Sequence, residues 1–353
     1  MKLQKILPGF FLLFFLGYFS FVGIAFSQNT AGSPTLLFQS DDPLSLTLTM
    51  DIRTVLKDTG DDMGQHPALI SYLTPEGDTI IVPLRIRTRG YFRRDPMNCN
   101  FPPLRLNFAK ETSGNTIFEG QDKLKLVTHC RSSGKQYEQN VLKEYLAYRF
   151  YNLFTEESYR VRLAEMNYAD SEGKIKTLRK LAFIIEPEEQ MAARNLCDEV
   201  KIKNIRQDYC DQEKATLLSV FQYMIGNTDW SVPAMHNIDL IRKQAGGSPI
   251  PVPFDFDWSG LVNAPYAVPS KNLNIDNVRI RVYRGLCRTE EEFEKAFQEF
   301  RDREEEIIRT IESVPYLDER EMSKTIRYIE QFFNVINNPN AVRKEIYNAC
   351  RTD

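Results

Sequence analysis

The chain has 353 residues, of which 42% are hydrophobic and 26% are charged, and these fractions are typical of a folded globular protein. Its formal net charge is −3, so the composition provides no basic surface for a nucleic acid or for an anionic membrane. The length suffices for one two-lobed domain or for two small domains.

The first 27 residues have the features of a secretory signal peptide. Two lysines precede an apolar run over 6–26, and Ala25 and Ser27 place small residues where cleavage before Gln28 requires them. The run is also long enough for a membrane anchor, which is the alternative. We expect export to the periplasm, the cell surface or the medium, no membrane association after cleavage, and a flexible lead over 28–44.

Six cysteines form an even set, which is compatible with disulfide bonds in an exported protein. Neither a CxxC motif nor another metal-ligand spacing occurs among them, and the chain has three histidines, so a structural zinc site is not expected. Cys197 and Cys210 flank one polar connection, and we predict that they pair. The other cysteines are Cys99, Cys130, Cys287 and Cys350.

Residues 45–186 are predicted to form a lobe built on an antiparallel sheet. Alternating apolar and polar residues between turn residues predict strands, and these cover 46–52, 68–73, 79–88, 102–108, 123–127, 159–168 and 175–185. Apolar residues at helical spacing predict one main helix over 136–154.

Four arginines surround one glycine between residues 87 and 94. Arg87 and Arg89 alternate with apolar residues on the strand predicted over 79–88, and Gly90 follows them. Guanidinium groups beside a glycine turn are suited to the phosphates of a nucleotide or of a phosphorylated substrate. The alternative is a solvated strand face whose arginines pair with surface acids.

Residues 187–353 are predicted to form a mainly helical lobe. Helices are expected over 188–195, 213–225, 289–311, 319–335 and 341–350. Thr289 is a good N-cap, because acidic residues follow it in the first turn. Clean alternation predicts a further strand over 278–282.

A predicted hairpin within 225–260 brings four polar residues together. Its short strands, 238–241 and 250–254, are joined by a turn rich in glycine. Carboxylate and amide oxygens that converge from two strands are suited to Mg²⁺ with a phosphate ester. The alternative is that these side chains cap turns and bind nothing. The four residues are Asp229, Asn237, Asp255 and Asp257.

These hairpin residues, in this order, resemble those of the CotH-type atypical kinase-like proteins and, more distantly, of HipA-like and secretory-pathway kinases. The resemblance covers roughly 84–287 and is specific over 229–260. It implies an α+β, two-lobed protein-kinase-like fold that binds ATP with Mg²⁺ or Mn²⁺ and phosphorylates a hydroxyl of an unknown acceptor, which is a protein, a glycan or a small molecule. Kinases place the Asn five residues after the Asp, whereas Asn237 follows Asp229 by eight.

The resemblance also implies roles for the hairpin residues. Asp229 would orient the attacking hydroxyl and accept its proton, while Asn227 shapes the loop. Asp255, with Asn237 or Asp257, would hold the metal ion, and Asp255 is the preferred principal ligand because it occupies the position of the kinase DFG aspartate.

A lysine and a glutamate in the first lobe complete the implied site. Lys125 on the strand 123–127, fixed by Glu144 on the main helix, would neutralise the leaving diphosphate, and Lys123 is the alternative lysine. Arg87, Arg89 and Gly90 would contact the phosphates. The connection between the lobes at Glu186 would meet the adenine.

Two other functions fit the same residues. A secreted pseudokinase would share the fold but act as a binding or scaffold protein, and the scarcity of ATP outside the cytoplasm favours it. A metal-dependent phosphoesterase would use the same acids, but such enzymes usually need more ligands, often histidine. His236 is expected to pack within its loop rather than to bind a metal.

Overall fold

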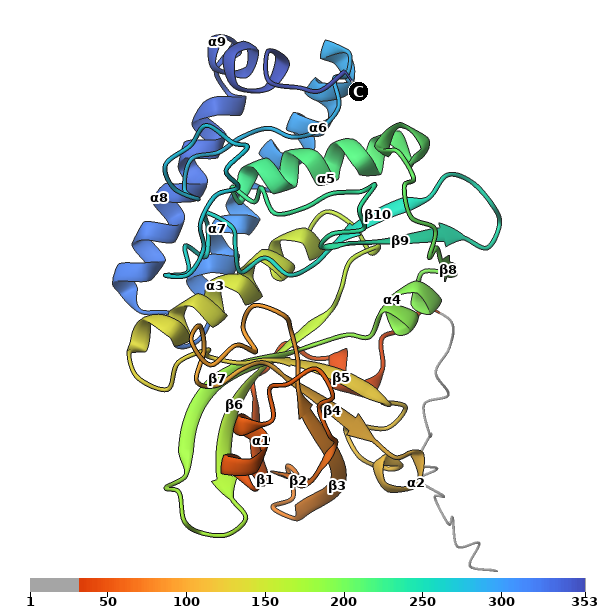
Figure 1. The fold of residues 1–353 in the computed structure, drawn as a ribbon. Coiled ribbons are helices and arrows are strands. Elements are labelled where there is room, and N and C mark those ends of the chain that lie inside the picture. The colour runs from red at the N-terminus through yellow and green to blue at the C-terminus, as the bar shows by residue number, and fades with distance from the viewer. Residues whose placement is uncertain (1–31, 353) are drawn as a thin grey trace, which may run out of the picture.

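Within residues 32–352, which the computed structural model describes, seven strands close into a β-barrel (Figure 1). Neighbouring strands are antiparallel except β1 and β6, which pair in parallel from Leu44 and Ala164 to Met50 and Asp170. The strands are β1 (Leu44–Met50), β2 (His66–Leu73), β3 (Thr79–Thr88), β4 (Leu104–Phe108), β5 (Lys123–Val127), β6 (Val161–Asp170) and β7 (Leu178–Ile185), in the order β1-β2-β3-β4-β5-β7-β6. The predicted antiparallel sheet is therefore a closed barrel with one parallel pair.

The interior of the barrel is filled by the apolar residues of the alternating strands. Leu48, Ile70 and Val82 are fully buried there, as are Leu124 and Leu126 of β5. Because successive side chains of a strand point to opposite faces, the residues between these leucines lie on the outer face of the barrel. The alternation of β5 therefore places its lysines outside the barrel.

The second half of the described chain is mainly helical and covers one side of the barrel (Figure 1). Helix α3 (Lys135–Asn152) lies between the barrel and the helices of the second half, and it packs on β6, β7 and α7. The other helices are α1 (Ile52–Lys57), α2 (Lys110–Ser113), α4 (Glu188–Arg194), α5 (Gln212–Met224), α6 (Glu290–Arg301), α7 (Glu304–Ser313), α8 (Glu319–Ile336) and α9 (Pro339–Val342), which a π-helical turn (Arg343–Tyr347) follows.

A three-stranded sheet contains the predicted hairpin. β9 (Ile238–Lys243) lies between β8 (Cys197–Glu199) and β10 (Ile250–Pro253), and the hairpin is in register from Ile238 opposite Pro253 to Ile241 opposite Ile250. β10 is an edge strand, which is where a strand with two prolines belongs. The hairpin prediction is thus confirmed.

Two predictions for the second half of the chain are wrong in detail. Residues 278–282 form no strand, because Arg279 and Arg281 stack on the ring of Tyr328, and Arg281 Nε donates to the Met224 carbonyl at 3.1 Å. The helix predicted over 289–311 is two helices, α6 and α7, that meet at Asp302 and Arg303. Its N-cap prediction is confirmed, since Thr289 forms a capping box with Glu292.

The predicted pairing of Cys197 with Cys210 is also wrong. The disulfide bonds are Cys99–Cys130 and Cys287–Cys350, and Cys197 and Cys210 are buried free thiols. The two free cysteines belong to different hydrophobic clusters, since Cys197 packs into the large core and Cys210 into a small one beside Trp230. The two cysteines flank the same polar connection in the sequence, but the fold places them in separate parts of the core.

Part of the predicted flexible lead over 28–44 is ordered. Leu36–Phe38 form a short 3₁₀ helix, and Leu37 and Phe38 are buried against the barrel core. Arg162 of β6 fixes the segment by donating to the Ser40 and Asp42 carbonyls. The predicted signal peptide lies outside the described residues. None of the helices within 32–352 has the length and hydrophobicity that crossing a bilayer requires.

Candidate functional site

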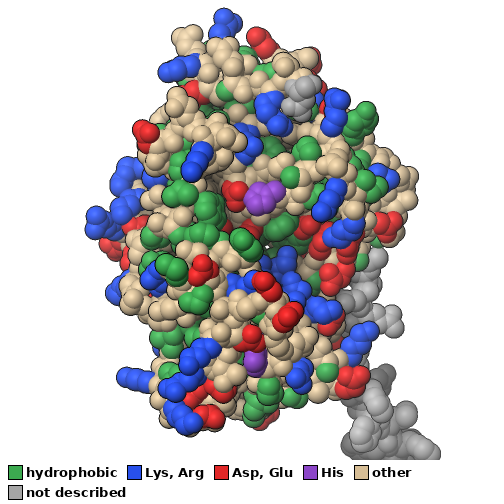
Figure 2. All heavy atoms as spheres, in the orientation of Figure 1, with side chains coloured by type: hydrophobic (Ala, Val, Ile, Leu, Met, Phe, Trp, Pro, Cys, Tyr) green, Lys and Arg blue, Asp and Glu red, His purple; other side chains and the backbone are tan. Residues whose placement is uncertain are grey.

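The four polar hairpin residues line one cavity at the boundary between the barrel and the helical part. The cavity has a volume of about 320 Å³, and Arg89 and Gly90 line its barrel side. The residues from the hairpin are Asp229, Asn237, Asp255 and Asp257. Figure 2 shows this boundary as a hollow in which basic, acidic and histidine side chains adjoin.

Asp229 is held by hydrogen bonds from both ends of its loop. Its backbone N–H donates to Asn227 Oδ1 at 2.9 Å. Its carboxylate lies 2.8 Å from His236 Nε2 and accepts from Asn237 Nδ2 at 3.1 Å. The expected packing role of His236 is therefore a direct contact with the predicted catalytic acid. The carboxylate stays partly exposed to the cavity, at 36% of its side-chain surface.

The backbone at Asn237 and Asp255 is in the left-handed region. Their φ angles are 53° and 59°, which residues other than glycine rarely adopt. The N–H of Phe254 donates to the Asn237 carbonyl at 3.1 Å, and the N–H of Asp255 donates to Tyr148 Oη at 2.9 Å. Such conformations persist where surrounding contacts enforce them, and they concentrate at functional sites.

Asp257 belongs to a buried cluster behind the cavity. Tyr266 Oη donates to Asp257 Oδ2 at 2.8 Å, and Arg93 Nη1 lies 3.9 Å from the same oxygen. Arg93 Nη1 also lies 3.8 Å from Glu144 Oε2. Burial and the neighbouring Asp255 raise the pKa of Asp257 to about 7, although Arg93 opposes this. Burial and Asp257 likewise raise the pKa of Glu144 well above its ordinary value.

The predicted ion pair between Lys125 and Glu144 is wrong, because Glu144 pairs with Arg93 instead. The loop after β3 inserts Arg93 into the buried space beside Glu144, where the arginine also donates to the Thr128 carbonyl. The Lys125 ammonium lies 4.9 Å from the centroid of the Phe254 ring. Burial and Arg89 lower the pKa of Lys125, while Asp239 and Asp255 oppose this.

Lys125 belongs to a group of four cations, here called the basic cluster: Arg87, Arg89, Arg105 and Lys125. Register places Arg87 opposite Arg105, and Arg105 opposite Lys125, across β3, β4 and β5. Burial and the charges of Arg89 and Arg87 lower the pKa of Arg105. Among the described residues, no carboxylate oxygen lies within 4 Å of a charged nitrogen of these four side chains, so the alternative of pairing with surface acids does not hold for Arg87 and Arg89. It does hold for Arg94, which pairs with the exposed Asp61 at 3.0 Å.

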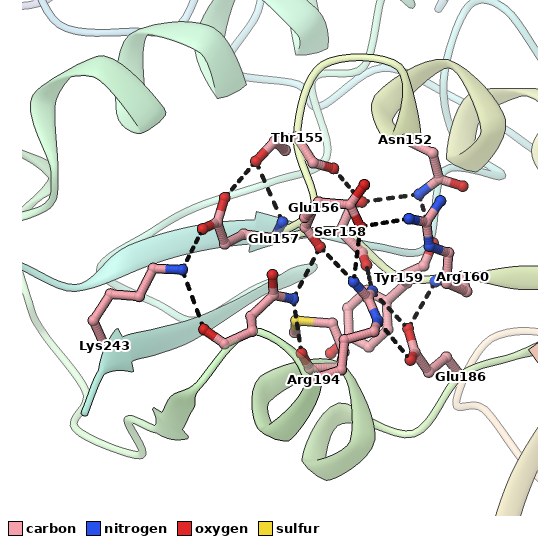
Figure 3. A network of polar contacts seen from close by, with 12 residues as sticks. Asn152, Thr155, Glu156, Glu157, Ser158, Tyr159, Arg160, Glu186, Arg194 and Lys243 are labelled. Carbon is pink, nitrogen blue, oxygen red and sulfur yellow. Dashed lines mark hydrogen bonds and ion pairs between the residues drawn. The ribbon is translucent and has the colours of Figure 1, made fainter. Parts of the chain in front are cut away.

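Two predicted cofactor-binding residues lie away from the cavity. Lys123 is exposed, lies 3.1 Å from Asp122, and lines a separate depression of about 700 Å³ on the barrel. The Glu186 carboxylate is buried and paired with Arg194 (Figure 3), and the Arg160 N–H donates to it at 2.9 Å. The Glu186 N–H itself donates to the Arg160 carbonyl, because β6 and β7 continue their pairing to this point.

The hairpin residues supply two accessible oxygen donors of the kind that a divalent cation binds, Asn237 Oδ1 and the Asp255 carboxylate. Among residues 32–352, no three His, Cys, Asp or Glu side chains cluster as metal ligands. Mg²⁺ is commonly bound by one or two carboxylates together with substrate phosphates, so a full protein cage is not required. Asn237 Nδ2 donates to Asp229, which leaves Oδ1 to bind a cation, and Asp255 is more accessible than the buried Asp257.

Sequence reasoning missed two members of the buried cluster. Arg93 is one of the four arginines near Gly90, but the sequence gives no sign that it alone is inserted beside Glu144. Tyr266 lies in a stretch rich in proline and asparagine, where no periodicity marks it. Both residues reach the cluster through loops, and the Cys99–Cys130 bond ties the loop that carries Arg93 to the segment after β5.

No protein-family model and no curated protein matches the chain. Among solved structures, the chain is similar to a proinflammatory kinase, CtkA, of Helicobacter pylori. The identity is 11%, the TM-score is 0.39, and the match covers 70% of this chain and 92% of that one. A similarity of this size carries no argument about this chain, and the resemblance to the CotH-type proteins stays a prediction.

Proposed function

We propose that this protein is an exported, kinase-like phosphotransferase that uses ATP with Mg²⁺ or Mn²⁺. The proposal includes a two-lobed kinase-like arrangement, with the barrel as the first lobe and the helical part as the second. One observation carries it: Arg89 of the basic cluster lines the cavity that the predicted metal-binding and catalytic side chains also line, and the other three cations lie on the adjoining strands without a carboxylate partner. Excess positive charge beside carboxylates is what a metal–triphosphate complex requires.

The metal ion would be held by Asp255 and by Asn237 Oδ1. When bound, a divalent cation neutralises charge on the phosphates and fixes their position. Both residues have a left-handed backbone, and both line the same cavity. Asp257 supports this arrangement from behind, since its contacts are with Tyr266 and Arg93.

Asp229 would orient the attacking hydroxyl and accept its proton. Its carboxylate is exposed to the cavity, and His236 and Asn237 fix its direction. Catalysis of phosphoryl transfer rests mainly on positioning and on charge neutralisation, so fixed side chains are what the reaction needs.

The basic cluster would bind the phosphates from the barrel side. Arg89 lines the cavity, and Lys125 lies close enough to Asp255 for the carboxylate to affect its pKa. In this proposal Arg93 takes the place expected for a lysine opposite Glu144, and it joins the main helix to the loop after β3. The acceptor is a hydroxyl of a protein, a glycan or a small molecule.

Thermal melting of the protein from Gln28 onward, with Mg²⁺ and with or without ATP, tests the proposal. A ligand that binds only the folded state increases the free energy of unfolding, by about 2.7 kcal/mol at a ligand concentration of a hundred times Kd, and it thereby raises the melting temperature. We expect a metal-dependent rise that Asp255→Asn abolishes. Asp78→Asn is the matched control, because Asp78 is an exposed acid in the turn between β2 and β3.

No rise at saturating ATP, or an equal rise in Asp255→Asn, would contradict the proposal. If ATP binds, transfer or release of the γ-phosphate from labelled ATP separates an active kinase from a pseudokinase. Binding without turnover would favour the scaffold function, for which the missing Lys125–Glu144 pair is the supporting observation.

A further inference from the structure

A second polar cavity lies next to the buried Glu144 cluster, along α3 and the segment after Gly260. Its volume is about 380 Å³, and α3, the segment after Gly260 and helix α8 enclose it. This volume is within the range of small-molecule sites. Lys143, the residue before Glu144, lines it, so neighbouring residues of one helix face two different sites.

Positive charge is in excess around this cavity. Among the described residues that line it, Lys143, Arg279 and Lys324 are cationic, and Glu321 is the one carboxylate. Lys143 Nζ donates to Glu321 Oε2 at 3.3 Å, and Lys324 Nζ donates to Glu321 Oε1 at 2.7 Å. A single carboxylate therefore serves both ammonium groups.

Lys143 is unusual because it is only 4% exposed. Its ammonium has three N–H donors, and within residues 32–352 Glu321 is its one hydrogen-bond partner. Burial lowers the pKa of Lys143; Glu321 opposes this, and Arg279 and Lys324 lower the pKa further. Glu321 supplies one negative charge against three cations, so a further anion would offset the remaining positive charge and would accept from the spare donors of Lys143.

Arg279, which also lines this cavity, is held in place by two contacts. Its guanidinium stacks 4.3 Å from the centroid of the Tyr328 ring, and Nη1 donates to the Gly260 carbonyl at 3.3 Å. A planar guanidinium that is fixed in this way loses little conformational entropy when it binds an anion. The cations thus come from three separate segments of the chain and are already positioned.

We propose that this cavity binds an oxyanion, a phosphate or sulfate group that is either free or carried by a small molecule. Lys143, Lys324 and Arg279 donate to its oxygens, and Glu321 competes with it for the two lysines. The site is distinct from the nucleotide site proposed above, and binding there joins α3, the segment after Gly260 and α8.

Isothermal titration of the protein from Gln28 onward with inorganic phosphate, and separately with O-phosphoserine, at matched ionic strength tests the site. Lys143→Met keeps the length of the buried side chain but removes its charge, and we expect it to weaken binding by about tenfold or more. Glu321→Gln removes the competing carboxylate, and we expect tighter binding. Binding of phosphate itself supports a free ion, and binding of phosphoserine alone supports an esterified one.

Lys203→Met is the matched control, because Lys203 is an exposed lysine that lines neither this cavity nor the cavity with the hairpin residues. We expect it to leave phosphate binding unchanged. The proposal is overturned if neither probe binds, if Lys143→Met binds as tightly as the unmodified protein, or if Lys203→Met weakens binding as much as Lys143→Met does. Thermal melts with phosphate against chloride provide a check, and the general stabilisation by excluded phosphate will appear equally in Lys143→Met.

Discussion

The contact between Asp229 and His236 is the clearest result at the scale of single residues. The imidazole and the Asn237 amide hold the carboxylate from two sides, while one edge of it faces the cavity. A general base that is already aligned accelerates proton transfer, because no free energy is spent on orienting the carboxylate during the reaction.

We therefore expect His236→Ala to slow phosphoryl transfer by about tenfold, since it removes one support of the carboxylate but not the base itself. The dissociation constant for ATP with Mg²⁺ should not change. Initial rates with labelled ATP, together with titration calorimetry, separate the two effects. Equal losses of affinity and rate would assign His236 to nucleotide binding instead.

A second prediction concerns Glu157, which lies between α3 and β6 and accepts a hydrogen bond from Lys243 of β9 (Figure 3). Burial alone raises the pKa of this carboxylate, but hydrogen bonds from Lys214, Lys243 and Thr155 outweigh it and lower the pKa to about 2. A lowered pKa in the folded state stabilises the protein above the ordinary carboxyl pKa. That stability is lost as the pH falls from about 4.5 toward 2.

Glu157→Gln should therefore cost about 1 to 2 kcal/mol of unfolding free energy at pH 7, after allowance for solvent screening. The cost should shrink as the pH falls below about 4.5. Urea unfolding of both proteins from pH 7 to pH 3 measures this difference. A cost that does not depend on pH would show that the ion pairs are not its source.

At the scale of elements, two glycines connect the hairpin to helix α8. Gly226 has a φ of 63°, and a Cβ there would lie 2.1 Å from Tyr328 Oη. A Cβ on Gly260 would lie 2.3 Å from the same oxygen. The two glycines are also joined directly, because the Gly260 N–H donates to the Gly226 carbonyl at 3.0 Å. The predicted loop residues thus depend on a close approach that no short motif reveals.

Gly226→Ala should destabilise the protein by about 3 kcal/mol, the sum of a left-handed backbone and overpacking against Tyr328. Gly77→Ala is the matched control, because Gly77 also has a positive φ but nothing lies within 4 Å of its Cβ position. We expect the control to cost about 1 kcal/mol. Denaturant midpoints of both variants measure the difference, and equal costs would refute the packing argument.

The sequence predicted individual elements better than their pairing. The bounds of β3 and β5 agree with the predicted strands, since alternation and flanking turns define them locally. The barrel closes through β1 and β6, which are far apart in the chain, and alternation contains no information on which strands pair. Likewise, the acids of the hairpin were predictable from the turn and the strands, whereas Arg93 reaches Glu144 by a loop fold that has no periodic signature.

At the scale of the whole molecule, one hydrophobic core unites the barrel and the helices. It contains Leu163 and Phe183 from the outer face of the barrel, Leu142 of α3, Phe221 of α5 and Phe332 of α8. The apolar residues inside the barrel form a second hydrophobic cluster, separate from this shared core. The cavity with the hairpin residues therefore lies at the boundary of two parts that pack as one body.

Because the core is shared, we expect the two parts to unfold in a single transition. Both tryptophans, Trp230 and Trp258, lie in the second part, so their fluorescence reports its unfolding. Far-UV circular dichroism reports the helices and the barrel together. Coincident urea transitions by the two probes are expected, and separate midpoints would show that the barrel and the helical part are independent.

The proposed function requires that Asp255 and Asn237 hold a divalent cation together with a nucleotide. The most direct test is a crystal structure of the protein with Mn²⁺ and a non-hydrolysable ATP analogue, in which anomalous scattering locates the metal. We expect one peak at about 2.1 Å from an Asp255 carboxylate oxygen and from Asn237 Oδ1, with the phosphates directed toward the basic cluster. A metal or nucleotide bound elsewhere, or an empty cavity at saturating concentrations, would contradict the proposed function.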